Sequence, residues 1–241
     1  LFTGSTEFTE MGQGTAIRIA DDDLDSDRGD SVHNFTAIDI TFAGDDTSAT
    51  TGTGIDDQGN QETRIENVEI SGISGDDSGT GVIINTGANL ELDDTSAGQS
   101  SASLIQDVEE GLVLNDVSLT GGARTINDTQ FRSISGQTTD DDAAIFINSA
   151  PGQDLTFDNI VIDSDTTSGT DSEFAPTGID YNAGGGDTLT VQNSDIGADT
   201  VTNPLRHGIN ATANVDLDVT TDTDIGVEEG GAGVVVNDSS V

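Results

Sequence analysis

A five-residue pattern recurs along this chain at nearly constant spacing, and it constrains the possible folds more than any other feature. Its clearest copy reads Gly-Val-Ile-Ile-Asn and occupies residues 81–85. Related segments begin at positions 54, 81, 111, 144, 178, 208 and 233, so successive copies lie 27, 30, 33, 34, 30 and 25 residues apart. A period in this range is typical of repeat architectures rather than of an ordinary globular domain.

A second pattern keeps the same period. Five apolar residues each stand two positions before an acid or an amide, and these pairs are Ile65 with Asn67, Leu92 with Asp94, Ile126 with Asp128, Phe157 with Asn159, and Val191 with Asn193. Successive apolar members are separated by 27, 34, 31 and 34 residues, close to the first series. Two markers that share one period indicate a repeated structural unit.

The expected elements are short strands, because apolar residues alternate with period two and clusters of Gly, Asp, Thr and Ser interrupt them. A repeat of several short strands without a helix fits one coil of a parallel β-helix of roughly 30 residues per coil. We therefore predict an all-β fold, a β-solenoid of about seven or eight coils. A β-sandwich with regularly spaced strands is the competing architecture.

Asparagine ends most copies of the pattern, at Asn85, Asn115, Asn148, Asn182 and Asn237. This column resembles the asparagine ladder of right-handed parallel β-helices of the pectate-lyase type, and the resemblance covers residues 54–237. We predict a single domain over residues 1–241, with regular coils in 54–241 and irregular first coils in 1–53, where residues 16–20 form an earlier copy. Since both ends fall within a repeat, we expect a segment of a longer polypeptide or assembly.

The net charge of the chain indicates a salt-rich habitat. The chain has 46 acidic residues against 6 basic ones and a formal net charge of −40. So many like charges repel each other in dilute buffer, whereas at molar salt the screening length falls to about 3 Å. The composition resembles proteins of extremely halophilic archaea and their viruses, which implies an extracellular, cell-surface or virion location.

The composition also excludes several classes of partner. Without a basic patch, nucleic acid is not expected as a partner. No segment approaches the roughly 20 apolar residues of a membrane span, and the absence of cysteine excludes disulfides and thiolate metal sites.

Alternation within the repeated pattern places its second and fourth residues inside and its third outside. The third position is apolar at Ile83, Val113, Phe146 and Val235. An outward apolar stripe on so acidic a protein indicates that something covers it. The cover is either a long turn of the same chain, within residues 94–103 or 164–176, or another subunit, as in the trimeric β-helical fibres of viral tailspikes. These four residues are the predicted interface.

One acidic segment has the spacing of a cation site. Asp23, Asp25, Asp27 and Asp30 could present oxygens to calcium. Arg28 stands where an EF-hand loop needs glycine and no helices flank the segment, so a solvated turn is the favoured interpretation. We expect no required cofactor, and calcium is the one candidate ion. Of the four sequons, those at Asn34, Asn127 and Asn210 would accept N-glycans in a secreted protein, whereas Asn237 is expected to turn inward to the asparagine ladder.

Enzyme signals are sparse. Asp180, Arg206 and His207 form the one candidate polar site, and we rank it below an ordinary structural role for each residue. The expected function is structural or adhesive, with self-association or binding of cell-surface glycans. The alternative is a lyase, hydrolase or epimerase that acts on polysaccharides, since related β-helices act on acidic sugars.

Overall fold

The fold is seen in a computed structural model, which describes residues 6–11, 14–19, 34–38, 40–44, 52–57, 62–66, 68–71, 79–84, 89–93, 103–115, 124–134, 143–148, 154–164, 177–182, 188–197, 205–211, 215–220 and 222–236. Within these ranges the regular structure is entirely β-strand. The same ranges contain no helix with the length and apolar character needed to cross a membrane.

The strands form three sheets. The first sheet comprises, in spatial order, β1 (Thr6–Met11), β4 (Ile40–Gly44), β7 (Glu69–Ser71), β10 (Ser103–Val108), β13 (Thr129–Ile134), β16 (Val161–Ser164), β19 (Asp195–Ile196) and β22 (Asp224–Ile225). The second comprises β2 (Gly14–Ile19), β5 (Gly52–Asp57), β8 (Thr80–Ile84), β11 (Glu110–Leu114), β14 (Ala143–Ile147), β17 (Thr177–Tyr181), β20 (Leu205–Ala211) and β23 (Val227–Val236). The third comprises β3 (Asn34–Ile38), β6 (Glu62–Glu66), β9 (Asn89–Asp93), β12 (Arg124–Asn127), β15 (Leu155–Asp158), β18 (Thr188–Gln192) and β21 (Asp216–Val219).

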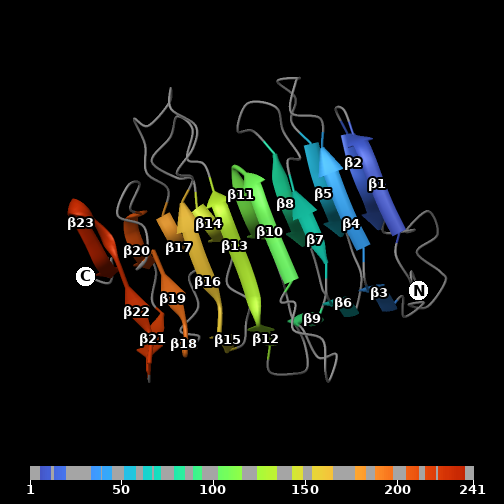
Figure 1. Ribbon diagram of the computed structural model, residues 1–241. Helices are drawn as coiled ribbons and strands as arrows, with labels where there is room; N and C mark the ends of the chain where they lie inside the picture. The colour runs from blue at the N-terminus through green and yellow to red at the C-terminus, as the bar shows by residue number, and fades with distance from the viewer. Residues whose placement is uncertain are drawn as a thin grey trace.

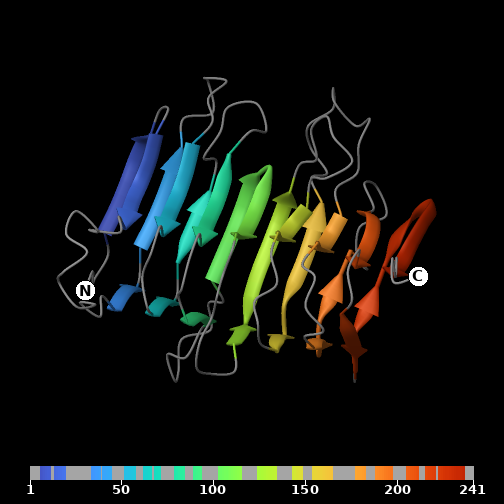
Figure 2. The ribbon, with the colours of Figure 1, turned by 180° about the vertical axis from the view of Figure 1, so that it is seen from behind.

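The chain visits the three sheets in a fixed order, so every third strand lies beside the last one in the same sheet. Figures 1 and 2 show the sheets extending together from blue β1 and β2 to red β22 and β23. The pairings within the sheets are parallel, as for β11 with β14 and β12 with β15. This arrangement is consistent with a β-solenoid and excludes the antiparallel sandwich for the described strands. Strands β1 to β4, within the predicted irregular region, occupy the same three sheets.

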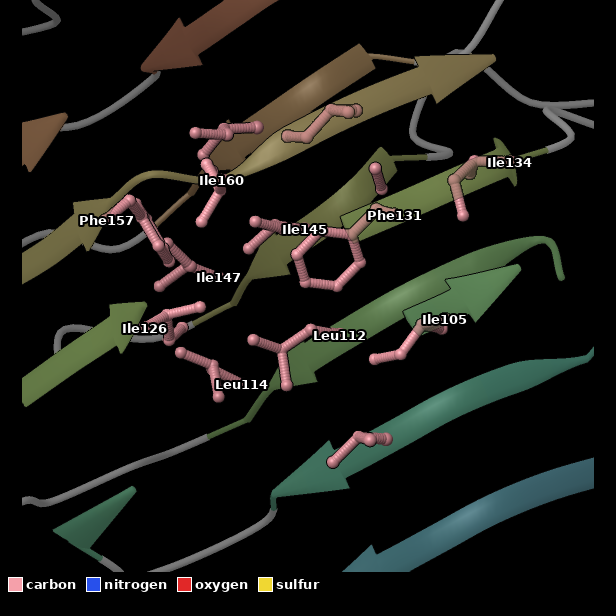
Figure 3. Close-up of a cluster of buried hydrophobic side chains, with 14 of the residues drawn as sticks. Ile105, Leu112, Leu114, Ile126, Phe131, Ile134, Ile145, Ile147, Phe157 and Ile160 are labelled. Atoms are coloured by element: carbon pink, nitrogen blue, oxygen red, sulfur yellow. The ribbon is translucent and has the colours of Figure 1, made fainter. Parts of the chain in front are cut away.

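The core lies between the sheets and consists of columns of apolar side chains. In the second sheet, register places Leu112 beside Val82 and Ile145, and all three are fully buried. Ile126 and Phe157 form a matching column in the third sheet. Figure 3 shows Leu112, Ile126, Phe131, Ile145 and Phe157 pointing into this shared interior. The predicted interior positions of the repeat are thus confirmed here, since parallel stacking buries each residue against its counterpart one repeat away.

The repeated glycine has a steric cause. A Cβ atom built on Gly111 would lie 2.7 Å from the carbonyl oxygen of Ala144 and would collide with the ring of Phe131. At Gly208 the equivalent carbonyl is that of Gly233, at 2.6 Å. At Gly111 and Gly208, a side chain would therefore collide with the next strand of the second sheet and with an apolar side chain of the first sheet.

The second sequence pattern marks a corner. The chain passes from the third sheet to the first through a residue with positive φ, which is 47° at Asp128, 54° at Asn159, 51° at Asn193 and 56° at Asp222. Asn and Asp adopt this left-handed conformation more readily than other residues with a side chain. At Asp128, Asn159 and Asn193, the acid or amide two positions after the apolar residue is therefore the residue that lets the chain turn, whereas Asn67 and Asp94 lie outside the described residues.

Candidate functional site

At this corner, acids accept hydrogen bonds from amides of the neighbouring repeat. Asn159 Nδ2 donates a hydrogen bond to Asp128 Oδ1, one repeat earlier. Asp158 accepts two bonds from the following repeat, one from Gln192 Nε2 at 2.9 Å and one from Asn193 Nδ2 at 2.7 Å. Parallel strands lie only about 4.8 Å apart, so two facing carboxylates would repel each other, whereas a carboxylate facing an amide gains a charge-assisted hydrogen bond. The corner therefore links successive strands through its acids.

Buried hydroxyl groups complete this corner. Ser194 Oγ donates to the carbonyl oxygen of Gln192 at 2.6 Å and accepts from the backbone N–H of Ile160 at 3.2 Å. Thr129 Oγ1 similarly donates to the carbonyl oxygen of Asn127 at 2.9 Å. These bonds satisfy backbone groups that the turn withdraws from the sheet ladders.

The asparagine ladder predicted after the second sheet is seen between Asn115 and Asn148. Asn148 Nδ2 lies 3.3 Å from Asn115 Oδ1 and donates a hydrogen bond to it. The backbone N–H of Asn148 also donates to the carbonyl oxygen of Leu114, at 2.9 Å. The ladder is confirmed for this pair, whereas Asn85 and Asn237 lie outside the described residues.

Two acids of the second sheet also bond to neighbouring strands. Glu110 Oε2 accepts from Thr80 Oγ1 at 3.1 Å. Asp180 Oδ1 accepts from Asn210 Nδ2 at the same distance, and Asp180 is only 6% exposed. Burial of a carboxylate is costly unless hydrogen bonds compensate it, so Asp180 serves at least as a link between β17 and β20.

The register does not bring the three candidate catalytic residues together. Asp180 pairs with Asn210, whereas His207 pairs with Thr177, three residues or about 10 Å away along the strand. Arg206 and His207 are both half-buried. The Nδ1 atom of His207 is buried and makes no hydrogen bond within the described part of the chain. General base chemistry would need this histidine to be oriented toward a carboxylate, and these contacts do not orient it in that way.

The predicted interface residues lie in one column across the second sheet. Register aligns Ile83, Val113 and Phe146, and the column continues through Asp180. Val113 is 5% exposed in the single chain and lies outside the contiguous core cluster. Ile83, Phe146 and Val235 are half-buried. The stripe is therefore partly covered by this chain itself, and its contact with another subunit stays a prediction.

The predicted calcium ligands Asp23, Asp25, Asp27 and Asp30 lie outside the described residues. Across the ranges that are described, no three His, Asp or Glu side chains cluster as metal ligands. Among the sequons, Asn127 is half-buried, and Asn210 is half-buried and bonded to Asp180. The backbone of Asn34 lies in β3, and its side chain is not described.

Sequence reasoning missed the role of Asp158 and Glu110. The available signal was positional, since Asp158 and Gln192 directly precede the left-handed residues Asn159 and Asn193. A polar residue there points outward beside its counterpart in the next repeat, within bonding distance. The second sequence pattern included Asn159 and Asn193 but not these neighbours, because acids are abundant throughout the chain.

No protein-family model, curated protein or solved structure matches this chain.

Proposed function

We propose that this protein is a structural or adhesive element on the outside of a halophilic archaeon or of its virus, built as a right-handed parallel β-helix of about seven or eight coils. At a strand spacing of about 4.8 Å, eight parallel strands extend over roughly 34 Å. Such a rod can space, display or join other components of a surface. Self-association along Ile83, Val113, Phe146 and Val235, or attachment to surface glycans, would anchor it.

One observation carries this proposal: five described acids each accept a hydrogen bond from the neighbouring repeat, namely Glu110, Asp128, Asp154, Asp158 and Asp180. Such bonds stabilise the stack, which is the task of a rigid structural element. Because the acidic residues, with a formal net charge of −40, repel each other in dilute buffer, the rod is suited to a salt-rich exterior.

Sedimentation velocity at molar salt tests the self-association. We expect the wild-type protein to sediment as an oligomer and Phe146→Asp to sediment as a monomer. Thr156→Asp is the matched control. Thr156 is also half-buried, but it lies in β15, which follows β14 in the chain and belongs to the third sheet. Circular dichroism of both variants verifies that they are folded. A monomeric wild-type protein at every concentration would remove the self-association from the proposal.

An activity assay separates the structural role from the polysaccharide-acting alternative. The purified protein is incubated at molar salt with uronate-rich polysaccharides, with and without calcium, and the products are followed as unsaturated sugars, new reducing ends and altered uronate stereochemistry. The structural role predicts no product. Turnover that disappears in both Asp180→Asn and His207→Gln, with folding intact, would replace the structural role with an enzymatic one.

A further inference from the structure

We draw no further inference here: the strongest candidate, the apolar face that the last strands β21 and β23 present through the exposed side chains of Val219, Val234 and Val236, carries nothing because no feature of the described residues shows what covers it.

Discussion

The inner strands of the sheets and the last strands contain the same apolar columns with opposite exposure. Ile209 in β20 is fully buried, whereas its register partner Val234 in β23 is 44% exposed. Val191 in β18 is likewise fully buried, while its partner Val219 in β21 is 38% exposed. The side-chain types are equivalent, so the difference comes from the presence of a neighbouring strand on each side.

The glycine column shows the same contrast. Gly208 has no room for a Cβ because the carbonyl oxygen of Gly233 would lie 2.6 Å from it. At Gly233 itself the nearest atom to such a Cβ is Ile225 Cγ2, at 3.6 Å. Both comparisons indicate that the stability of each strand depends mainly on its immediate neighbours, as in other repeat proteins. Paired substitutions in the two regions can test this.

The largest difference is expected for core truncation. Ile145→Ala should lower the free energy of unfolding by about 2–5 kcal/mol, because it leaves a cavity between packed strands. Val236→Ala should cost less than about 1 kcal/mol, since Val236 is already 53% exposed and little apolar contact is lost. Denaturant unfolding of both variants at molar salt measures the two values. Equal losses would show that the contribution of an apolar side chain to stability does not depend on a neighbouring strand.

The next difference is expected at the glycines. Gly111→Ala should destabilise the protein by about 1–3 kcal/mol, because the new methyl group must displace Phe131 or the carbonyl of Ala144. Gly233→Ala should be neutral or slightly stabilising, since the methyl group has space and alanine reduces the freedom of the unfolded chain. Ala144 occupies the same column, so the strain is local and the first variant should still fold. Thermal melts of the two proteins side by side test the pair.

Much of this architecture follows from the sequence. The period of the Gly-Val-Ile-Ile-Asn pattern predicted parallel strands in stacked repeats, and the second pattern, which includes Ile126 and Phe157, predicted a repeated structural unit with the same period. Both are confirmed, because equivalent positions of successive repeats have equivalent neighbours when the strands stack in parallel. The cause of the glycine was not predicted, since it depends on Phe131, which belongs to another sheet and follows Gly111 by 20 positions (131 − 111).

The candidate site was predicted less well. Outward residues were assigned by alternation alone, and this does not reveal that Asp180 is buried and bonded to Asn210. The proposed trio combined residues that are close in the repeat pattern, but the register places His207 opposite Thr177 instead. With 46 acids in the chain, proximity of a carboxylate to another polar residue carries little information without the actual pairing.

A smaller, salt-dependent effect is expected at the corner between the third and first sheets. Asn159→Asp replaces the donor to Asp128 with a second carboxylate, so it should lower the melting temperature more than Asn159→Gly, which removes the bond and also tolerates the positive φ of 54°. The gap between the two variants should narrow as salt rises from about 0.1 M to about 1 M, because the screening length falls from about 10 Å to about 3 Å. A gap that is independent of salt would argue that packing, and not charge, selects the amide at this position.

The smallest effect is expected in the asparagine ladder. The bond from Asn148 to Asn115 is 3.3 Å long and Asn148 is exposed, so Asn148→Ala should cost about 0.5 kcal/mol, at the low end for a neutral hydrogen bond. A double-mutant cycle with Asn115→Ala isolates the contribution of the side-chain pair. A coupling close to the single-variant loss would show that the amides stabilise each other. A coupling near zero would instead assign the asparagines a role in the turn that follows each strand, since each substitution would then act within its own repeat.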